Sequence, residues 1–63
     1  MDEEKFNMSM RRFLKKVGVS SQQKIEQAVQ QSGSDSGKFA IKMVLTMPGL
    51  DLTHTVEDEI ELD

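Results

Sequence analysis

The sequence contains no cysteine, and this absence excludes disulfide bonds and metal sites built on thiolates. It fits a reducing compartment such as the cytosol, where disulfides are rare. The chain has a single histidine, His54, and metal sites that depend on one histidine are uncommon. We therefore expect no metal and no cofactor.

Long apolar runs are also missing, because none approaches the roughly 20 residues of a membrane span. The first residues are acidic, whereas a signal peptide begins with a basic region. We therefore expect a cytoplasmic protein without a membrane segment. The 63 residues allow one small domain over residues 1–63, and a core of that size is marginal without a staple or a partner.

Charge is divided unevenly along the chain. Residues 5–42 hold all eight Lys and Arg with two acids, a balance of +6, while residues 43–63 hold six acids and no base. The simpler interpretation is that the two halves attract each other, within one molecule or across a dimer. The alternative is a basic docking face on the first helix, formed by Arg11, Arg12, Lys15 and Lys16.

The first half of the chain has a helical period. Apolar side chains between Phe6 and Val17 recur every three to four residues and predict a helix over residues 2–17. Gly18 is a typical helix terminator, and Ser20 or Ser21 could cap a second helix over residues 21–32. The second helix has a thin apolar stripe, so we expect it to pack on another element.

After Gly37 the period changes to two. Odd-numbered apolar residues from Phe39 to Met47 form one strand, and Pro48-Gly49 is a turn signal before a second strand. A turn at Pro48-Gly49 keeps every apolar residue on one face, and a four-residue loop is an alternative that also does so. The expected partners are Met47 with Leu50, Leu45 with Leu52, Met43 with His54 and Ile41 with Val56.

A third strand is predicted at residues 60–62, after a turn at residues 57–59. A three-residue loop would put Ile60 and Leu62 on the face that the helices cover, and a two-residue turn would put them on the opposite face. The expected fold class is therefore α+β, with two N-terminal helices packed on a three-stranded antiparallel sheet (ααβββ). Phe6, Phe13 and Phe39 all fall at predicted core positions.

Two helices cover one face of such a sheet and leave its edges open, and exposed edges invite pairing with another chain. The acidic last strand would repel a copy of itself, whereas the first strand carries Lys38 and Lys42 and no acid. Together with the small core, this favours a homodimer.

The functional hypothesis that follows is a small non-catalytic interaction protein that binds a protein partner through Arg11, Arg12, Lys15 and Lys16. The alternative is a DNA-binding helix-turn-helix over residues 10–31, with Gly18 in the turn. The proposed reading helix has one lysine, Lys24, near Glu26, which is little charge for phosphate contacts and argues against nucleic acid.

Catalysis finds little support in the sequence. His54 could act as a general base, but no nucleophile or second ligand lies at a recognisable spacing, so a packed or edge histidine is the simpler interpretation. Residues 33–38 superficially suggest a phosphate loop, yet three residues separate the glycines where four are needed, and Phe39 replaces Ser or Thr. We expect no enzymatic activity.

Three stretches of the chain resemble a family of short bacterial proteins of unknown function. They are KFNMSMRRFLKKVGVSSQ at residues 5–22, GLDLTH at residues 49–54 and EIEL at residues 59–62. Members of the family are about as long as this chain, so the resemblance covers all of it. It implies no activity, ligand or functional residue.

Overall fold

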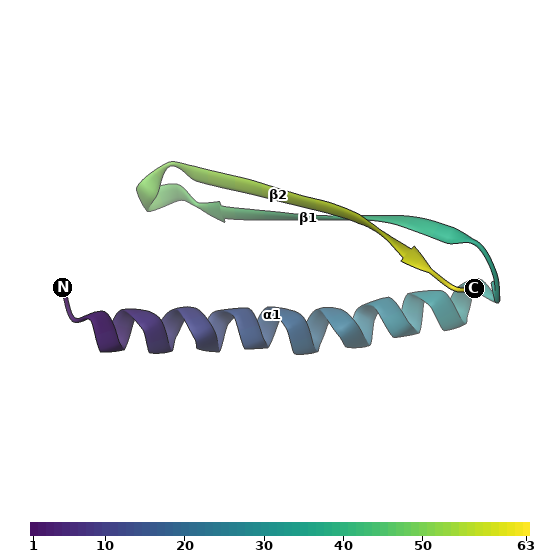
Figure 1. The fold of residues 1–63 in the computed structure, drawn as a ribbon, viewed down its shortest axis with the longest axis horizontal. Coiled ribbons are helices and arrows are strands. Elements are labelled where there is room, and N and C mark those ends of the chain that lie inside the picture. Colours follow the sequence, from purple (N-terminus) through teal and green to yellow (C-terminus); the bar gives the residue numbers. More distant parts are fainter. The chain divides into compact units, whose positions relative to one another are not determined.

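A computed structural model describes all 63 residues of the chain. Helix α1 (Glu3–Ser32) is followed by strand β1 (Lys38–Met47), a short 3-10 turn η1 (Pro48–Leu50) and strand β2 (Leu52–Glu61) (Figure 1). The chain divides into two units, Met1–Gly33 and Ser34–Asp63, which hold the helix and the hairpin respectively. The fold is α+β, and the expectation of one domain over residues 1–63 stays a prediction.

Helix α1 has defined signals at both ends. The Asp2 carboxylate accepts a hydrogen bond from the backbone N–H of Lys5 at 3.1 Å, which satisfies one of the free donors of the first turn. Glu3 and Glu4 add negative charge where the helix dipole favours it. At the other end, Gly33 adopts a left-handed φ of 70°, and its N–H bonds to the Gln30 carbonyl.

The prediction of two helices is wrong, because α1 continues through Gly18 without a break. A glycine inside a helix costs about 1 kcal/mol relative to alanine, while a continuous helix keeps the intrahelical hydrogen bonds that two separate helix ends would give up to water. Ser20, expected as a possible cap, lies inside α1 and donates its hydroxyl to the Lys16 carbonyl at 2.7 Å. The predicted stop at residue 17 and start at residue 21 are therefore both interior positions.

Strands β1 and β2 form a two-stranded antiparallel hairpin in which Met47 pairs with Leu52 and Lys38 with Glu61. The connection is the four-residue loop, residues 48–51, so the expected partners are wrong by two residues while the apolar residues stay on one face. Asp51 takes the left-handed φ of 56° that closes the loop, and its N–H bonds to the Pro48 carbonyl at 3.3 Å.

The predicted third strand does not exist, because β2 runs without a turn through residues 57–59. The four-residue loop leaves β1 with enough length to pair with all ten residues of β2. Ile60 pairs with Phe39 and so lies on the same face as Val56. No glycine or proline lies between Leu52 and Glu61 to interrupt the strand.

The open end of the hairpin is closed by Gly37 and the last two residues. The N–H of Gly37 donates to the Asp63 carboxylate, and the Gly37 carbonyl accepts from the N–H of Leu62, both at 2.9 Å. Gly37 has a φ of 101°, a conformation that L side chains rarely adopt.

Neither unit buries a side chain by itself. The three phenylalanines expected in a core are exposed, at 49% for Phe6, 51% for Phe13 and 42% for Phe39. An isolated hairpin of two strands is marginally stable at best in water, and an amphipathic helix takes most of its stability from packing. The apolar surface of both units therefore needs a partner surface.

Candidate interaction surfaces

The basic face of α1 consists of Arg11, Arg12, Lys15 and Lys16, and all four side chains are exposed. Their spacing of three and four residues places them as neighbours on one side of the helix. In a helix over residues 2–17, as predicted, these four cations would lie near the C-terminal end and complement the helix dipole. In the structure α1 continues to Ser32, and its last turn carries no basic residue, so that stabilisation is absent.

No carboxylate neutralises the basic face from within α1. The residues three or four positions away from each of the four cations are apolar, neutral polar or basic. Like charges at a spacing of four residues destabilise a helix by about 0.2–0.5 kcal/mol per pair, and Arg11 with Lys15 and Arg12 with Lys16 are two such pairs. The chain's ion pair lies elsewhere, between Lys38 and Glu61 at 3.9 Å.

Two apolar side chains that the sequence analysis did not include flank the basic face. Met8 lies one turn before Arg12, and Val19 lies one turn after Lys15, so both share its side of the helix. They are 69% and 53% exposed. The helical spacing of Met8 and Val19 from the cations was the signal in the sequence that could have identified them. Val19 was missed because the predicted helix ended at residue 17.

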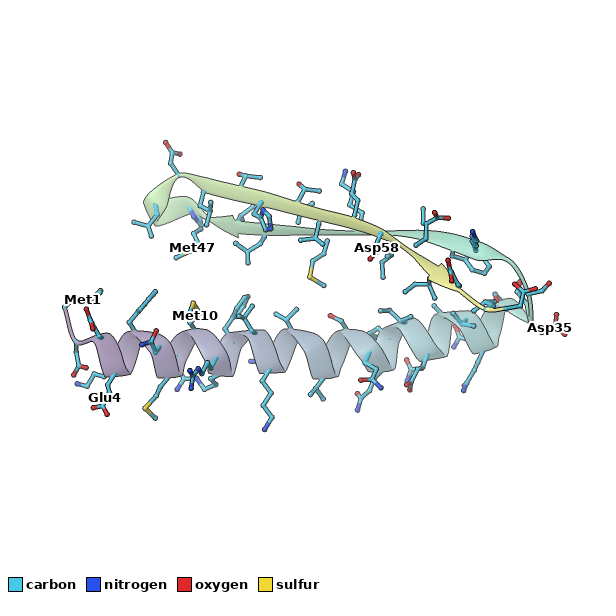
Figure 2. The ribbon with its side chains drawn as sticks, viewed as in Figure 1. Met1, Glu4, Met10, Asp35, Met47 and Asp58 are labelled. Carbon is cyan, nitrogen blue, oxygen red and sulfur yellow. The ribbon has the colours of Figure 1, made fainter.

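The hairpin has one apolar and one polar face, and the side chains of the two faces project from opposite sides of the ribbon in Figure 2. Nine of the ten paired positions of β1 and β2 on the apolar face are nonpolar or histidine, and Asp58 is the tenth. The apolar face holds Phe39, Ile41, Met43, Leu45, Met47, Leu52, His54, Val56, Asp58 and Ile60.

The polar face carries a cross-strand arrangement of charge. Lys42 pairs with Glu57, and Lys38 pairs with Glu61, so each lysine of β1 faces a carboxylate of β2. Such opposite-charge pairs contribute roughly 0.2–1 kcal/mol each. These pairs explain why the acidic segment extends β2 instead of forming a turn.

His54 lies on the apolar face opposite Leu45, not opposite Met43 as expected, because the register differs by two residues. Its side chain is exposed. No group of three or more His, Cys, Asp or Glu side chains lies close enough together to hold a metal ion.

A family model matches residues 1–63, the whole of the chain. The chain belongs to a family of unknown function, DUF6494. The resemblance carried by residues 5–22, 49–54 and 59–62 is thereby confirmed as membership of such a family. No curated protein and no solved structure matches this DUF6494 chain. Its one α-helix is not apolar enough to serve as a membrane span.

The DUF6494 chain does not have the helices that a helix-turn-helix needs. Residues 10–31 lie within one continuous helix, so no turn separates a supporting helix from a reading helix. The basic cluster and the glutamine-rich stretch that follows it are successive parts of α1. The structural basis of the DNA-binding alternative is therefore lost.

Proposed function

We propose that this chain is a non-catalytic, homodimeric interaction protein of the bacterial cytoplasm that binds an acidic protein segment through the basic face of α1. The observation that carries the proposal is the cluster of Arg11, Arg12, Lys15 and Lys16, which is exposed and has no carboxylate neighbour on the helix. A chain with a net charge of −3 that concentrates four cations on one helix face has a local surface suited to an anionic partner.

The flanking residues favour a protein segment over a nucleic acid. Met8 and Val19 offer exposed apolar contacts at the two ends of the basic face, which suit a segment whose carboxylates lie between apolar side chains. A phosphate backbone gains little from such contacts, and phosphate binding depends on the number of cations that it meets. The net charge of −3 also disfavours DNA.

The homodimer is supported by the exposure of the apolar surfaces. The three phenylalanines and Met43 are each more than two-fifths exposed. Exposed apolar side chains in such number, on each of the two units, favour an interaction site. The absence of cysteine agrees with a cytoplasmic location, and the proposal includes no cofactor.

The test uses a fluorescent acidic peptide, oligoglutamate with leucines at its ends, titrated with the full-length protein at low and at high salt. We expect binding at low salt that weakens at high salt, because the contact is electrostatic and exposed. The double variant R11Q/K15Q should bind about twofold to thirtyfold more weakly, since each exposed ion pair contributes about 0.2–1 kcal/mol.

The matched control is K24Q/K38Q, which removes the same charge from the opposite side of α1 and from the hairpin, and should retain most of the affinity. A parallel titration with random duplex DNA distinguishes a protein partner from a nucleic-acid partner. If duplex DNA binds more tightly than the peptide, and R11Q/K15Q abolishes that binding, the partner is a nucleic acid and the proposal fails. Equal peptide affinities for the two double variants would show that the basic face is not the site.

A further inference from the structure

We infer that two copies of this chain associate through the outer edges of their β1 strands, which join the two hairpins into one four-stranded antiparallel sheet with Met43 at its twofold axis. The inference rests on the homodimer of the proposed function and adds its geometry. The starting observation is that the sheet has only two strands, so β1 and β2 each have one edge without a partner strand.

The β2 edge is protected by charge against pairing with a copy of itself. Four carboxylates, on Glu57, Asp58, Glu59 and Glu61, lie in its second half. An antiparallel copy paired there would bring carboxylates of the two chains close together, and inward or edge charges of this kind prevent association. The edge that remains available belongs to β1.

The β1 edge has the opposite character. It contains no acid, and its two lysines, Lys38 and Lys42, each face a carboxylate of β2 across the hairpin. Because both lysines are paired with carboxylates, a second β1 strand at this edge would meet less positive charge. The remaining residues of β1 are apolar or threonine, which are typical of strand contacts.

The two faces restrict the possible registers. Residues that lie directly opposite each other share a face of the sheet, so the apolar faces of two copies are continuous only when odd residues pair with odd residues. Pairing centred on Lys42 would place two lysines against each other at the axis. Pairing centred on Met43 avoids this contact and keeps nine residues of each β1 strand paired, residues 39–47.

In this register the apolar face has a complete set of partners. Met43 meets Met43 of the partner subunit, Ile41 meets Leu45 of the partner subunit, and Phe39 meets Met47 of the partner subunit. On the polar face, Lys42 meets Val44 of the partner subunit. The acidic β2 strands become the two outer edges of the four-stranded sheet, where their charge discourages further growth.

The first experiment uses the natural absence of cysteine, so that a single introduced cysteine is the only thiol. Met43→Cys places two thiols opposite each other across the axis, with Cβ atoms about 4.5–5.5 Å apart, which is close to disulfide geometry. Val56→Cys is the matched control. Val56 pairs with Met43 in the hairpin, so its two copies would lie three strand spacings, about 14 Å, apart.

The second experiment alters charge at Val44, which faces Thr55 within the hairpin and Lys42 of the partner subunit in the inferred register. Val44→Lys creates two like-charge pairs per dimer and should raise the dimer dissociation constant about twofold to thirtyfold. Val44→Glu creates two opposite-charge pairs and should lower the constant. Thr55→Lys adds the same positive charge one strand farther from the interface and should change it little.

Solution mass by light scattering separates the possible outcomes. The inference is supported by a dimer that meets three conditions. Met43→Cys forms a disulfide under mild aerobic oxidation, Val56→Cys does not, and the two Val44 variants shift the dissociation constant in opposite directions. A dimer that cross-links through Val56→Cys, or through neither cysteine, overturns the β1 geometry and leaves the homodimer intact. A monomer at every concentration overturns both.

Discussion

At the scale of single residues, Gly18 inside α1 and Gly33 directly after it show that the backbone context decides what a glycine does. Gly33 has a φ of 70° and ends the helix, while Gly18 lies inside it. An added Cβ atom would meet nothing within 4 Å at either position, so the two sites differ in backbone conformation and not in available space. The sequence pattern around Gly18 resembled a helix end because serines follow it, but Ser20 bonds back to the Lys16 carbonyl.

This difference predicts opposite effects for the same substitution. Gly18→Ala should stabilise the protein by up to about 1 kcal/mol, because alanine loses less conformational entropy in a helix. Gly33→Ala should destabilise it by about 1 kcal/mol, since alanine is strained at a positive φ. Thermal melting followed by circular dichroism at 222 nm measures both. A lower melting temperature for Gly18→Ala would show that the helix is interrupted at that residue.

At the scale of elements, the sequence predicted the change from a helical to a strand period, a helix end at residue 32, a strand from Phe39 to Met47 and the face that its apolar residues occupy, but it left the face of Ile60 open. It did not predict that α1 is continuous or that the hairpin has two strands. Both errors concern connections. Glycine, serine and short acidic runs are compatible with a turn. Whether such a segment forms a turn or continues its element depends on how many residues of the neighbouring element can pair with it.

The acidic run at residues 57–61 illustrates this dependence. Read alone, it is a polar segment that favours a turn, whereas opposite β1 its acids match the lysines in spacing, four residues apart on both strands. Once the four-residue loop fixes the register, Glu57 and Glu61 lie opposite Lys42 and Lys38. The same comparison on the sequence would have indicated a long hairpin.

The pairing of Lys42 with Glu57 can be tested by charge reversal. Glu57→Lys places two lysines opposite each other and should lower the melting temperature by about 1–6 °C at low salt, since a cross-strand pair contributes roughly 0.2–1 kcal/mol. The double variant K42E/E57K restores opposite charges and should recover most of the loss. Because both side chains are exposed, the difference should shrink at high salt. A double variant less stable than Glu57→Lys would contradict the register.

At the scale of the whole molecule, the candidate site was more predictable than its surroundings. The four cations of the basic face could be read from their spacing alone, because every helix through residues 11–16 brings them together. Met8 could be read in the same way, because it lies inside the predicted helix, but Val19 could not, since including it required a helix that continues past Gly18. The expectation that so short a chain needs a partner followed from length alone and stays a prediction.

A homodimer makes thermal stability depend on protein concentration, because dissociation accompanies unfolding. For two chains of this length, a hundredfold increase in concentration should raise the melting temperature by about 10 °C, from a mass-action term of about 2.7 kcal/mol and the average entropy of unfolding per residue. Calorimetry or circular dichroism in cells of different path length gives this dependence.

Val44→Lys should shift the whole curve downward while leaving its slope unchanged, since the slope reports the number of chains and the position reports their affinity. A melting temperature that stays constant over the hundredfold range, with reversible unfolding, would require a folded monomer, and the exposed Phe6, Phe13 and Phe39 would then need a partner of another kind.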